Sequence, residues 1–135
     1  MNNPERKEYR VPGLPEPLSH YTDAVRFGNV LHVSGIVGMD EDNRVVSGGT
    51  VGQTRQIFRN LQKVFDAVGE GVSFQDVLKV TVFMLDVEER AQINPVRREF
   101  FGDARPTSTL IGVKALALPE LRIEIECVVG IPVSV

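Results

Sequence analysis

The sequence predicts an α+β domain in which two helices cover one face of a single mixed sheet. Helical and strand-like segments follow the order β-β-α-β-α-β-β. The helical segments carry apolar residues at three- and four-residue steps, whereas the strands show period-two alternation or dense β-branched runs. A chain of 135 residues also suffices for one domain that buries about two-thirds of its unfolded surface. We therefore expect a single domain over residues 1–135.

The N-terminal part predicts a lead-in followed by a hairpin. Residues 1–19 contain four of the eight prolines, and proline cannot donate to a sheet ladder, so we expect an irregular lead-in there. Residues 20–27 and 30–36 are short β-rich segments. Gly28-Asn29 between them is typical of a two-residue hairpin connection.

The middle of the chain predicts a helix and then an interior strand. Apolar residues recur at helical spacing from Thr50 to Val68. Thr50 and Gln53 have the form of a capping box, and Gly69 supplies a left-handed stop. Residues 77–85 are so rich in apolar side chains that we expect a central strand covered on both faces.

A second helix is expected after a short turn. Asp86 resembles a helix start, but Pro95 would clash inside a continuing helix. We therefore expect a restart with Asn94 as N-cap and Pro95 at the first helical position, ending near Phe101. A loop that carries Arg105 then leads to the last two strands.

The final strand places two carboxylates on one of its faces. Glu124 and Glu126 alternate with apolar residues over residues 121–129. A strand that faces water would explain these carboxylates equally well. The single cysteine, Cys127, lies in the apolar phase and is expected to be a small buried hydrophobe.

Composition and motifs exclude several classes of function. The net charge is −3 with dispersed charges, so nucleic acid is an improbable partner. The polar N-terminus and the absence of an apolar run of about 20 residues indicate a cytoplasmic protein without a membrane span. His20 and His32 do not have the spacing of a recognised metal site, and no nucleophile elbow or phosphate loop is present. We therefore expect chemistry without metal, cofactor or covalent intermediate.

Several motifs together resemble the Rid (reactive intermediate deaminase) family, also called the YjgF or L-PSP endoribonuclease-like family. The resemblance covers nearly the whole chain. Its C-terminal part is a loop arginine, a Ser/Thr cluster, a Leu-Pro turn and Ile-Glu-Ile-Glu. The upstream motifs are Val33-Ser34-Gly35, Gln53-Thr-Arg-Gln, Val77-Leu-Lys-Val-Thr-Val-Phe and Ile93-Asn94.

The resemblance implies a fold, an assembly and an activity. The implied fold is chorismate-mutase-like, with three subunits that pack their sheets into a central barrel and bind ligands in clefts between neighbours. Such a barrel would enclose the face that carries Glu124. The implied activity is hydrolysis of a small carboxylated enamine or imine to a 2-oxo acid and ammonia, for which positioning and acid/base assistance suffice.

Two alternatives to this small-imine activity stay open. One is deamination of a larger conjugated enamine, such as 2-aminomuconate or a related semialdehyde. The other is a non-catalytic regulatory protein that binds a small ligand. An endoribonuclease, the older family label, is the least favoured because the charge does not suit RNA.

The resemblance also assigns roles to individual residues. Glu124 matches the family position that handles water, and Glu126 is expected to support it or to be solvated. Tyr21 would form a wall of the pocket, or would simply be a half-buried strand aromatic. Ser34 belongs to the family's Ser-Gly-Gln, although Ile36 replaces the glutamine here and makes the pocket floor apolar.

The resemblance leaves two alternatives for the group that binds the substrate carboxylate. Asn94 matches a family asparagine, although its expected role as N-cap is sufficient to explain it. Arg105 is farther from Glu124 in sequence than the family's substrate arginine, whose place falls at Ser108, Thr109 or the next residue. Either the loop bulges to bring Arg105 into the pocket of Glu124, as we expect, or Ser108, Thr109 and backbone amides hold the carboxylate.

Overall fold

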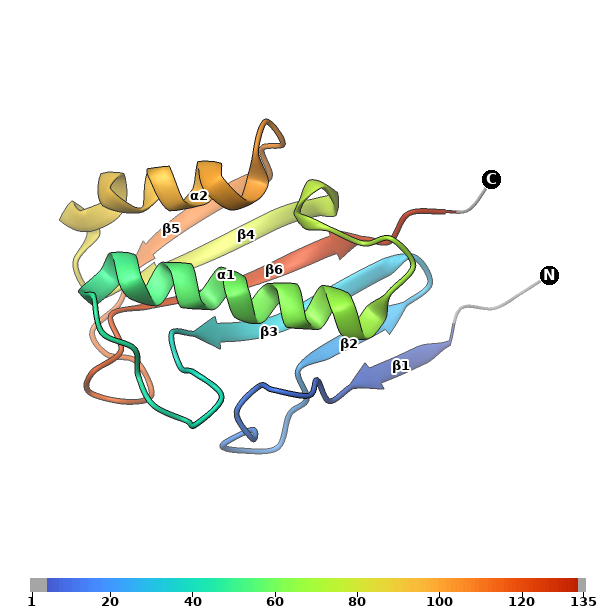
Figure 1. Cartoon of the computed structure of the whole chain (residues 1–135), viewed down its shortest axis with the longest axis horizontal. Coiled ribbons are helices and arrows are strands. Elements are labelled where there is room, and N and C mark those ends of the chain that lie inside the picture. The colour runs from blue at the N-terminus through green and yellow to red at the C-terminus, as the bar shows by residue number, and fades with distance from the viewer. Residues whose placement is uncertain (1–4, 134–135) are drawn as a thin grey trace.

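The structure, a computed structural model, describes residues 5–133. These residues form six strands and two α-helices, with two short 3-10 helices (η1 and η2) between them (Figure 1). The elements are β1 (Arg6–Tyr9), β2 (Ala24–Phe27), β3 (Val30–Val37), α1 (Gly49–Val68), η1 (Phe74–Asp76), β4 (Val77–Met84), η2 (Val87–Ile93), α2 (Asn94–Phe101), β5 (Thr107–Gly112) and β6 (Ile123–Gly130).

The strands form one mixed sheet with both α-helices on the same face (Figure 1). The strand order is β1-β2-β3-β6-β4-β5. Only β4 and β5 are parallel among the paired strands of residues 5–133, and the other pairs are antiparallel. The predicted α+β class and helix placement are confirmed.

The expected irregular lead-in is wrong over Arg6–Tyr9. These residues form β1, which pairs with β2 through partners such as Tyr9 and Ala24. The pairing is possible because no proline occurs between residues 5 and 11, and it buries Tyr9 at the sheet edge. Residues 10–23 contain no helix or strand, and residues 1–4 lie outside the described part.

The predicted hairpin is confirmed, although its first strand is shorter than expected. Gly28 adopts φ 64° in the turn between β2 and β3, a conformation that glycine tolerates without strain. β2 begins only at Ala24 because the preceding residue, Asp23, bonds to the N-terminal lead-in. The Asp23 carboxylate accepts a hydrogen bond of 2.7 Å from the Val11 amide and forms an ion pair with Arg10.

Helix α1 confirms the predicted helix but not its predicted cap. Gly69 ends it with φ 73°, as expected. Its N-cap is Gly48, and no side chain caps the first turn. The capping box is wrong because the Thr50 and Gln53 side chains bond to other segments, as described below.

Helix α2 begins one residue earlier than predicted. Asp86 does start a helical segment, since its carboxylate accepts from the Glu88 amide at the start of η2. The chain then passes from η2 into α2 with Asn94 already helical (φ −61°, ψ −40°) and with Pro95 in the first turn. Asn94 therefore does not cap the helix, and its exposed side chain is available for another role.

The core lies between the helices and the sheet. Five phenylalanine rings from α1, η1 and α2 contact one another with centroid distances of 5.1–5.9 Å. They are Phe58, Phe65, Phe74, Phe100 and Phe101. Strand β6 alternates as predicted, with its odd-numbered residues buried. Cys127 is among them, and burial raises the pKa of its thiol to about 12.

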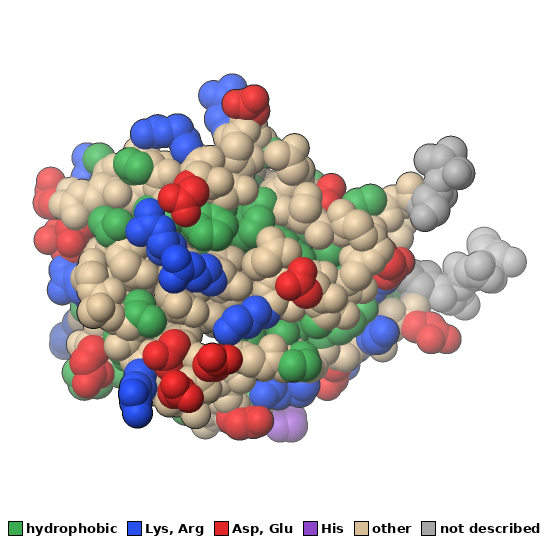
Figure 2. Space-filling model, in the orientation of Figure 1, with side chains coloured by type: hydrophobic (Ala, Val, Ile, Leu, Met, Phe, Trp, Pro, Cys, Tyr) green, Lys and Arg blue, Asp and Glu red, His purple; other side chains and the backbone are tan. Residues whose placement is uncertain are grey.

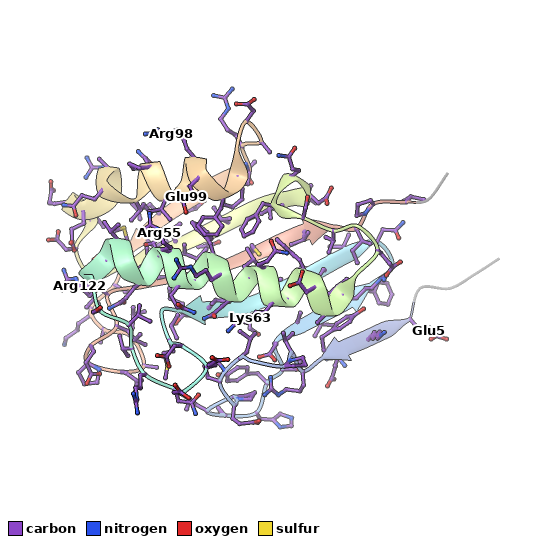
Figure 3. The ribbon with its side chains drawn as sticks, viewed as in Figure 1. Glu5, Arg55, Lys63, Arg98, Glu99 and Arg122 are labelled. Atoms are coloured by element: carbon purple, nitrogen blue, oxygen red, sulfur yellow. The ribbon has the colours of Figure 1, made fainter. Side chains whose placement is uncertain are left out.

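The two faces of the molecule differ in character. Basic and acidic side chains are interspersed over the helical side seen in Figure 2, and Arg55 of α1 pairs with Glu99 of α2 at 3.3 Å (Figure 3). The opposite face of the sheet is uncovered in a single chain. We call it the open face. Strand β4 is interior as predicted, but Leu78 and Lys79 are exposed, so the chain alone covers only one side of it.

Candidate active site

Glu124 lies in a hollow of about 310 Å³ at one end of the open face. It is half-buried on β6, opposite Val37 of β3 and Phe83 of β4. The walls come from the N-terminal lead-in, the bulge of β3 and the loop before β6. They include Tyr21, Ser34, Gly35, Leu118 and Leu121.

The Glu124 carboxylate packs directly against the backbone of Gly35. A Cβ atom placed on Gly35 would overlap the carboxylate and would lie 2.8 Å from Cδ of Glu124. This close approach arises from the irregular register of β3 against β6 between Val33 and Ile36. Only glycine fits at this position while Glu124 keeps its orientation.

Burial and a like charge act together on Glu124. Desolvation raises the pKa of the Glu124 carboxyl, and the negative charge of Glu126 raises it further. Glu126 lies two residues along the same face of β6 but is exposed. Glu124 therefore has the environment of a carboxyl group that can accept and return a proton more readily than an ordinary exposed glutamate.

Tyr21 and Ser34 lie beside Glu124, where the sequence placed them. The half-exposed Tyr21 ring lines the hollow, and its hydroxyl accepts a hydrogen bond of 3.2 Å from the Leu18 amide. The Ser34 hydroxyl donates to the Thr22 carbonyl at 2.6 Å. A second hollow of about 270 Å³ shares several of these walls and includes Ile36, which does not line the hollow of Glu124 itself.

Asn94 and Arg105 line a different hollow, of about 720 Å³, beside α2. The expected common pocket of Arg105 and Glu124 does not form within one chain, for a geometric reason. Thr107 pairs with Lys79 at one end of β4, whereas Glu124 pairs with Phe83 near the other end. Arg105 precedes Thr107 by two residues. At the usual rise per residue, Arg105 therefore lies about 20 Å along the sheet from the level of Glu124.

Ser108 and Thr109 lie on edge strand β5 and do not line the hollow of Glu124. Thr109 is level with Thr81 on the open face, and Ser108 is level with Val80 on the helical side. Both are exposed. The single chain thus gives neither hydroxyl a contact with the Glu124 pocket.

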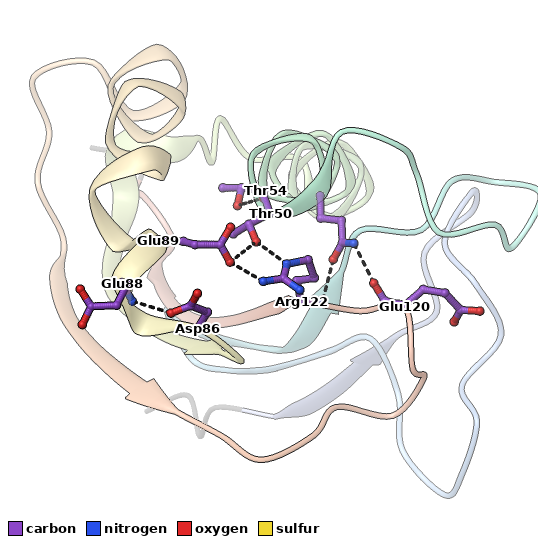
Figure 4. Close-up of polar contacts among 8 residues, drawn as sticks. Thr50, Thr54, Asp86, Glu88, Glu89, Glu120 and Arg122 are labelled. Atoms are coloured by element: carbon purple, nitrogen blue, oxygen red, sulfur yellow. Dashed lines mark hydrogen bonds and ion pairs between the residues drawn. The ribbon is translucent and has the colours of Figure 1, made fainter.

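A polar network anchors the loop that closes the Glu124 hollow (Figure 4). Arg122 donates to Thr50 at 3.0 Å and to Glu89 at 2.6 Å, and Glu89 raises the pKa of the Arg122 guanidinium. The Gln53 side chain bonds to the Glu120 carbonyl at 3.0 Å and accepts from the Arg122 amide at 2.9 Å. The helical positions of Thr50 and Gln53 were predicted from the sequence, but nothing in it signals their partners, which are 39 or more residues away.

Residues 5–133 contain neither a cluster of metal ligands nor a membrane-spanning helix. No three side chains of His, Cys, Asp or Glu are grouped there in a way that could hold a metal ion. No helix in that range combines the length and apolar character needed to cross a membrane.

The fold is that of a class of small α+β proteins with known structures. The crystal structure of a putative endoribonuclease from Thermotoga maritima superimposes with a TM-score of 0.81 at 31% identity and covers 92% of this chain and 98% of that one. The family model described as endoribonuclease L-PSP matches residues 13–131. The chain therefore belongs to the L-PSP endoribonuclease family, the Rid family that its motifs resemble.

Two relatives carry names that state an activity. A 2-iminobutanoate/2-iminopropanoate deaminase of Dermatophagoides farinae is 36% identical over 122 residues, which are 90% of this chain and 93% of that protein. A 3-aminoacrylate deaminase of Acinetobacter baylyi is 35% identical over 124 residues, which are 90% of this chain and 96% of that protein.

Proposed function

We propose that the protein is a hydrolytic deaminase that converts reactive 2-enamines or 2-imines to 2-oxo acids and ammonia. The observation that carries this proposal is the half-buried Glu124, whose pKa is raised inside a hollow of about 310 Å³. A carboxyl group of this kind can move a proton to and from water beside a small substrate. The names of the two relatives support the same reaction class.

The chemistry requires only the addition of water to a C=N bond. Ionised Glu124 accepts a proton from a water molecule as the water oxygen bonds to the carbon of the protonated imine (C=NH2+), which gives a neutral carbinolamine. The protonated Glu124 then donates this proton to the carbinolamine nitrogen. As the C–N bond breaks and ammonia leaves, the hydroxyl group gives its proton back to the Glu124 carboxylate and becomes the C=O group, and the proton finally passes from Glu124 to the released ammonia or to solvent. Tyr21 and Gly35 confine the substrate next to the carboxylate, and this positioning supplies most of the acceleration.

The site is proposed to be completed by assembly into a homotrimer with clefts between subunits. Two features support this arrangement. Glu124 and Arg105 lie in separate hollows of one chain, and the open face exposes apolar side chains, as interfaces do. In the proposed trimer, a neighbouring chain brings its hollow of Asn94 and Arg105 next to each Glu124.

A second candidate is a deaminase of a larger conjugated enamine, such as 2-aminomuconate. The apolar hollow of about 270 Å³ beside the Glu124 pocket favours it, because it offers room for a longer carbon chain. A regulatory protein that binds a 2-oxo acid without turnover is the non-enzymatic alternative.

The decisive experiment generates the unstable substrate in place. Threonine dehydratase releases 2-aminobut-2-enoate, which tautomerises to 2-iminobutanoate, and the wild-type protein should accelerate loss of the imine. Glu124→Gln should reduce turnover by about 10²-fold, the usual contribution of a positioned acid/base. Glu126→Gln, the matched control on the same strand, should have a much smaller effect.

Each outcome separates the candidates. No acceleration by a correctly folded and assembled protein would remove the small-imine reaction and leave the two alternatives. Equal activity of Glu124→Gln and wild type would return Glu124 to a structural role. A larger loss in Glu126→Gln would mean that the wrong carboxylate has been assigned.

A further inference from the structure

A groove between α2 and β5 contains the hollow of Arg105, but none of its residues has yet been given a part in the chemical steps. Two hollows of about 720 and 320 Å³ lie along it. Asn94 and Arg97 line both hollows, so these residues mark the place where the two adjoin. Val82 and Leu110 form an apolar wall at one end.

The groove is rich in guanidinium groups. Arg97, Arg98 and Arg105 line the larger hollow, where Asp103 is the one carboxylate among the lining residues. Arg90 borders the smaller hollow and donates to the Val87 carbonyl at 3.0 Å. Such a concentration of positive charge favours an anionic ligand.

Arg97 differs from the other arginines of α2 and its surroundings. It is half-buried, whereas Arg98 and Arg105 are exposed. Its guanidinium has no hydrogen-bond or ion-pair partner within residues 5–133, and the same is true of Arg98 and Arg105, so Arg97 is set apart by being half-buried without a partner. Desolvation lowers the pKa of Arg97. A charge removed from water in this way is stabilised when an anion binds to it.

Asn94 and Arg97 are arranged so that both side chains can bind one carboxylate. Their spacing of three residues on a helix places both side chains on the same face. The planar guanidinium can bind both oxygens of a carboxylate, and the amide nitrogen of Asn94 can add a third hydrogen bond. Asn94 is free for this role because it does not cap α2.

We infer that Arg97 is the substrate-binding residue that holds the carboxylate of the imine, with Asn94 beside it. This assignment rests on the proposed function for its place in the reaction. Arg97 is favoured over Arg105 because it lies at the junction of both hollows and is partly withdrawn from water. Since Glu124 lies in another hollow of the same chain, one chain would contribute Arg97 and a neighbour would contribute Glu124.

Binding of the product analogue tests the clamp without turnover. In calorimetric titrations, wild type should bind 2-oxobutanoate but not butanone, which lacks the carboxylate. Arg97→Gln should weaken 2-oxobutanoate binding by about tenfold or more, as expected for a lost charge-assisted hydrogen bond. Arg97→Lys should restore part of it, because the ammonium retains charge without the planar fork.

The control is Arg59→Gln on α1, which removes an equally charged but exposed arginine outside the groove. It should leave the Kd unchanged. Circular dichroism and light scattering establish that every variant keeps its fold and assembly. Equal binding by Arg97→Gln and wild type, or no 2-oxobutanoate binding by wild type, would overturn the assignment.

Kinetics and subunit mixing test the role in the reaction. Arg97→Gln should raise KM more than it lowers kcat. When the Arg97→Gln and Glu124→Gln proteins are unfolded together and reassembled, about a quarter of the clefts in a random trimer should contain both native residues. Activity should recover accordingly, and no recovery would overturn the assignment.

The two proposals can fail separately. If wild type binds 2-oxobutanoate through Arg97 but does not accelerate imine loss, the clamp stands and the deaminase function fails. If wild type accelerates imine loss and Arg97→Gln retains the native KM, the function stands and the clamp fails.

Discussion

The contact between Glu124 and Gly35 determines where the carboxylate of the proposed site can lie. Because Gly35 has no side chain, Glu124 rests against the backbone of β3 and is held in the hollow. This dependence was missed in the sequence, where the Ser34-Gly35 pair served only as part of a family motif. The clash becomes visible only when the neighbouring strand is in place.

Gly35→Ala should therefore damage activity more than stability. The added methyl group meets the end of a flexible side chain, which can rotate away at little cost, but the carboxylate then leaves its position. We expect kcat to fall by about tenfold or more, with little change in the denaturant midpoint. Gly130→Ala on β6 is the control, since its methyl group would make an ordinary contact at 3.6 Å with Leu78. Native activity of Gly35→Ala would contradict the proposed orientation.

The raised pKa of Glu124 predicts a stability difference that depends on pH. The ordinary pKa of a glutamate carboxyl is 4.5. At a pH just above this value, the Glu124 carboxyl is mostly ionised in the unfolded state but remains partly protonated in the folded state. The folded state thus binds more protons, so stability falls as pH rises through this window. Glu124→Gln should unfold at a higher temperature than wild type at neutral pH.

Differential scanning fluorimetry across pH measures this effect. The difference between Glu124→Gln and wild type should vanish below pH 4.5, where the native carboxyl is protonated. The exposed Glu120→Gln serves as the control and should shift unfolding little. A destabilised Glu124→Gln at neutral pH would contradict the assigned cause of the pKa shift.

At the scale of elements, Gln53 connects the start of α1 to the loop before β6. It is buried, and its amide serves both the Glu120 carbonyl and the Arg122 backbone amide. Gln53→Ala should reduce the free energy of unfolding by about 2–3 kcal/mol, because two backbone groups lose their partners.

Urea unfolding provides the measurement for this prediction. Gln62→Ala, an exposed position on the same helix, should cost less than about 0.5 kcal/mol. If Gln53→Ala costs no more than Gln62→Ala, the network of Figure 4 does not stabilise the loop.

The elements that the sequence predicted well are those whose signal is local. The hairpin at Gly28, the apolar stripe of α1 and the alternation of β6 depend on periodicity and turn residues. Strand β1 was not predicted, because Arg6–Tyr9 are extended only as a result of their pairing with β2. The capping box failed for the same kind of reason, since Thr50 and Gln53 have stronger partners far away in sequence.

In the candidate site, too, residues whose position depends on distant pairing could not be placed from local sequence patterns. Glu124, Tyr21 and Ser34 were grouped in one pocket only through the family resemblance, and in the structure they line one hollow because β3 pairs with β6. Arg105 could not be placed, because the parallel pairing of β4 and β5 sets its distance from Glu124 and no local pattern reports that pairing. Arg97 had a usable signal, its spacing of three residues from Asn94, but only its burial singles it out.

At the scale of the whole molecule, the open face determines whether the chain can function alone. Phe27 and Leu78 are 55% and 53% exposed on this side of the sheet, and Val30 and Ile111 are also exposed. Apolar surface of this extent on a sheet is normally covered by another subunit. The proposed ring of three chains would cover this face, and the proposed clamp requires that the same ring bring the Glu124 hollow of one chain to the Arg97 groove of the next.

We predict that the protein is a trimer in solution and that Leu78→Glu disrupts it. Burying a charge in the apolar interface without a partner is strongly unfavourable. Size-exclusion chromatography with light scattering at micromolar concentration should give three times the mass of one chain for wild type and a smaller mass for Leu78→Glu. Imine turnover should fall together with the mass, because the cleft needs two chains. Arg59→Glu, a charge change on the outer surface of α1, should leave mass and turnover unchanged. A stable and fully active wild-type monomer would remove both the shared cleft and the enclosure of Glu124.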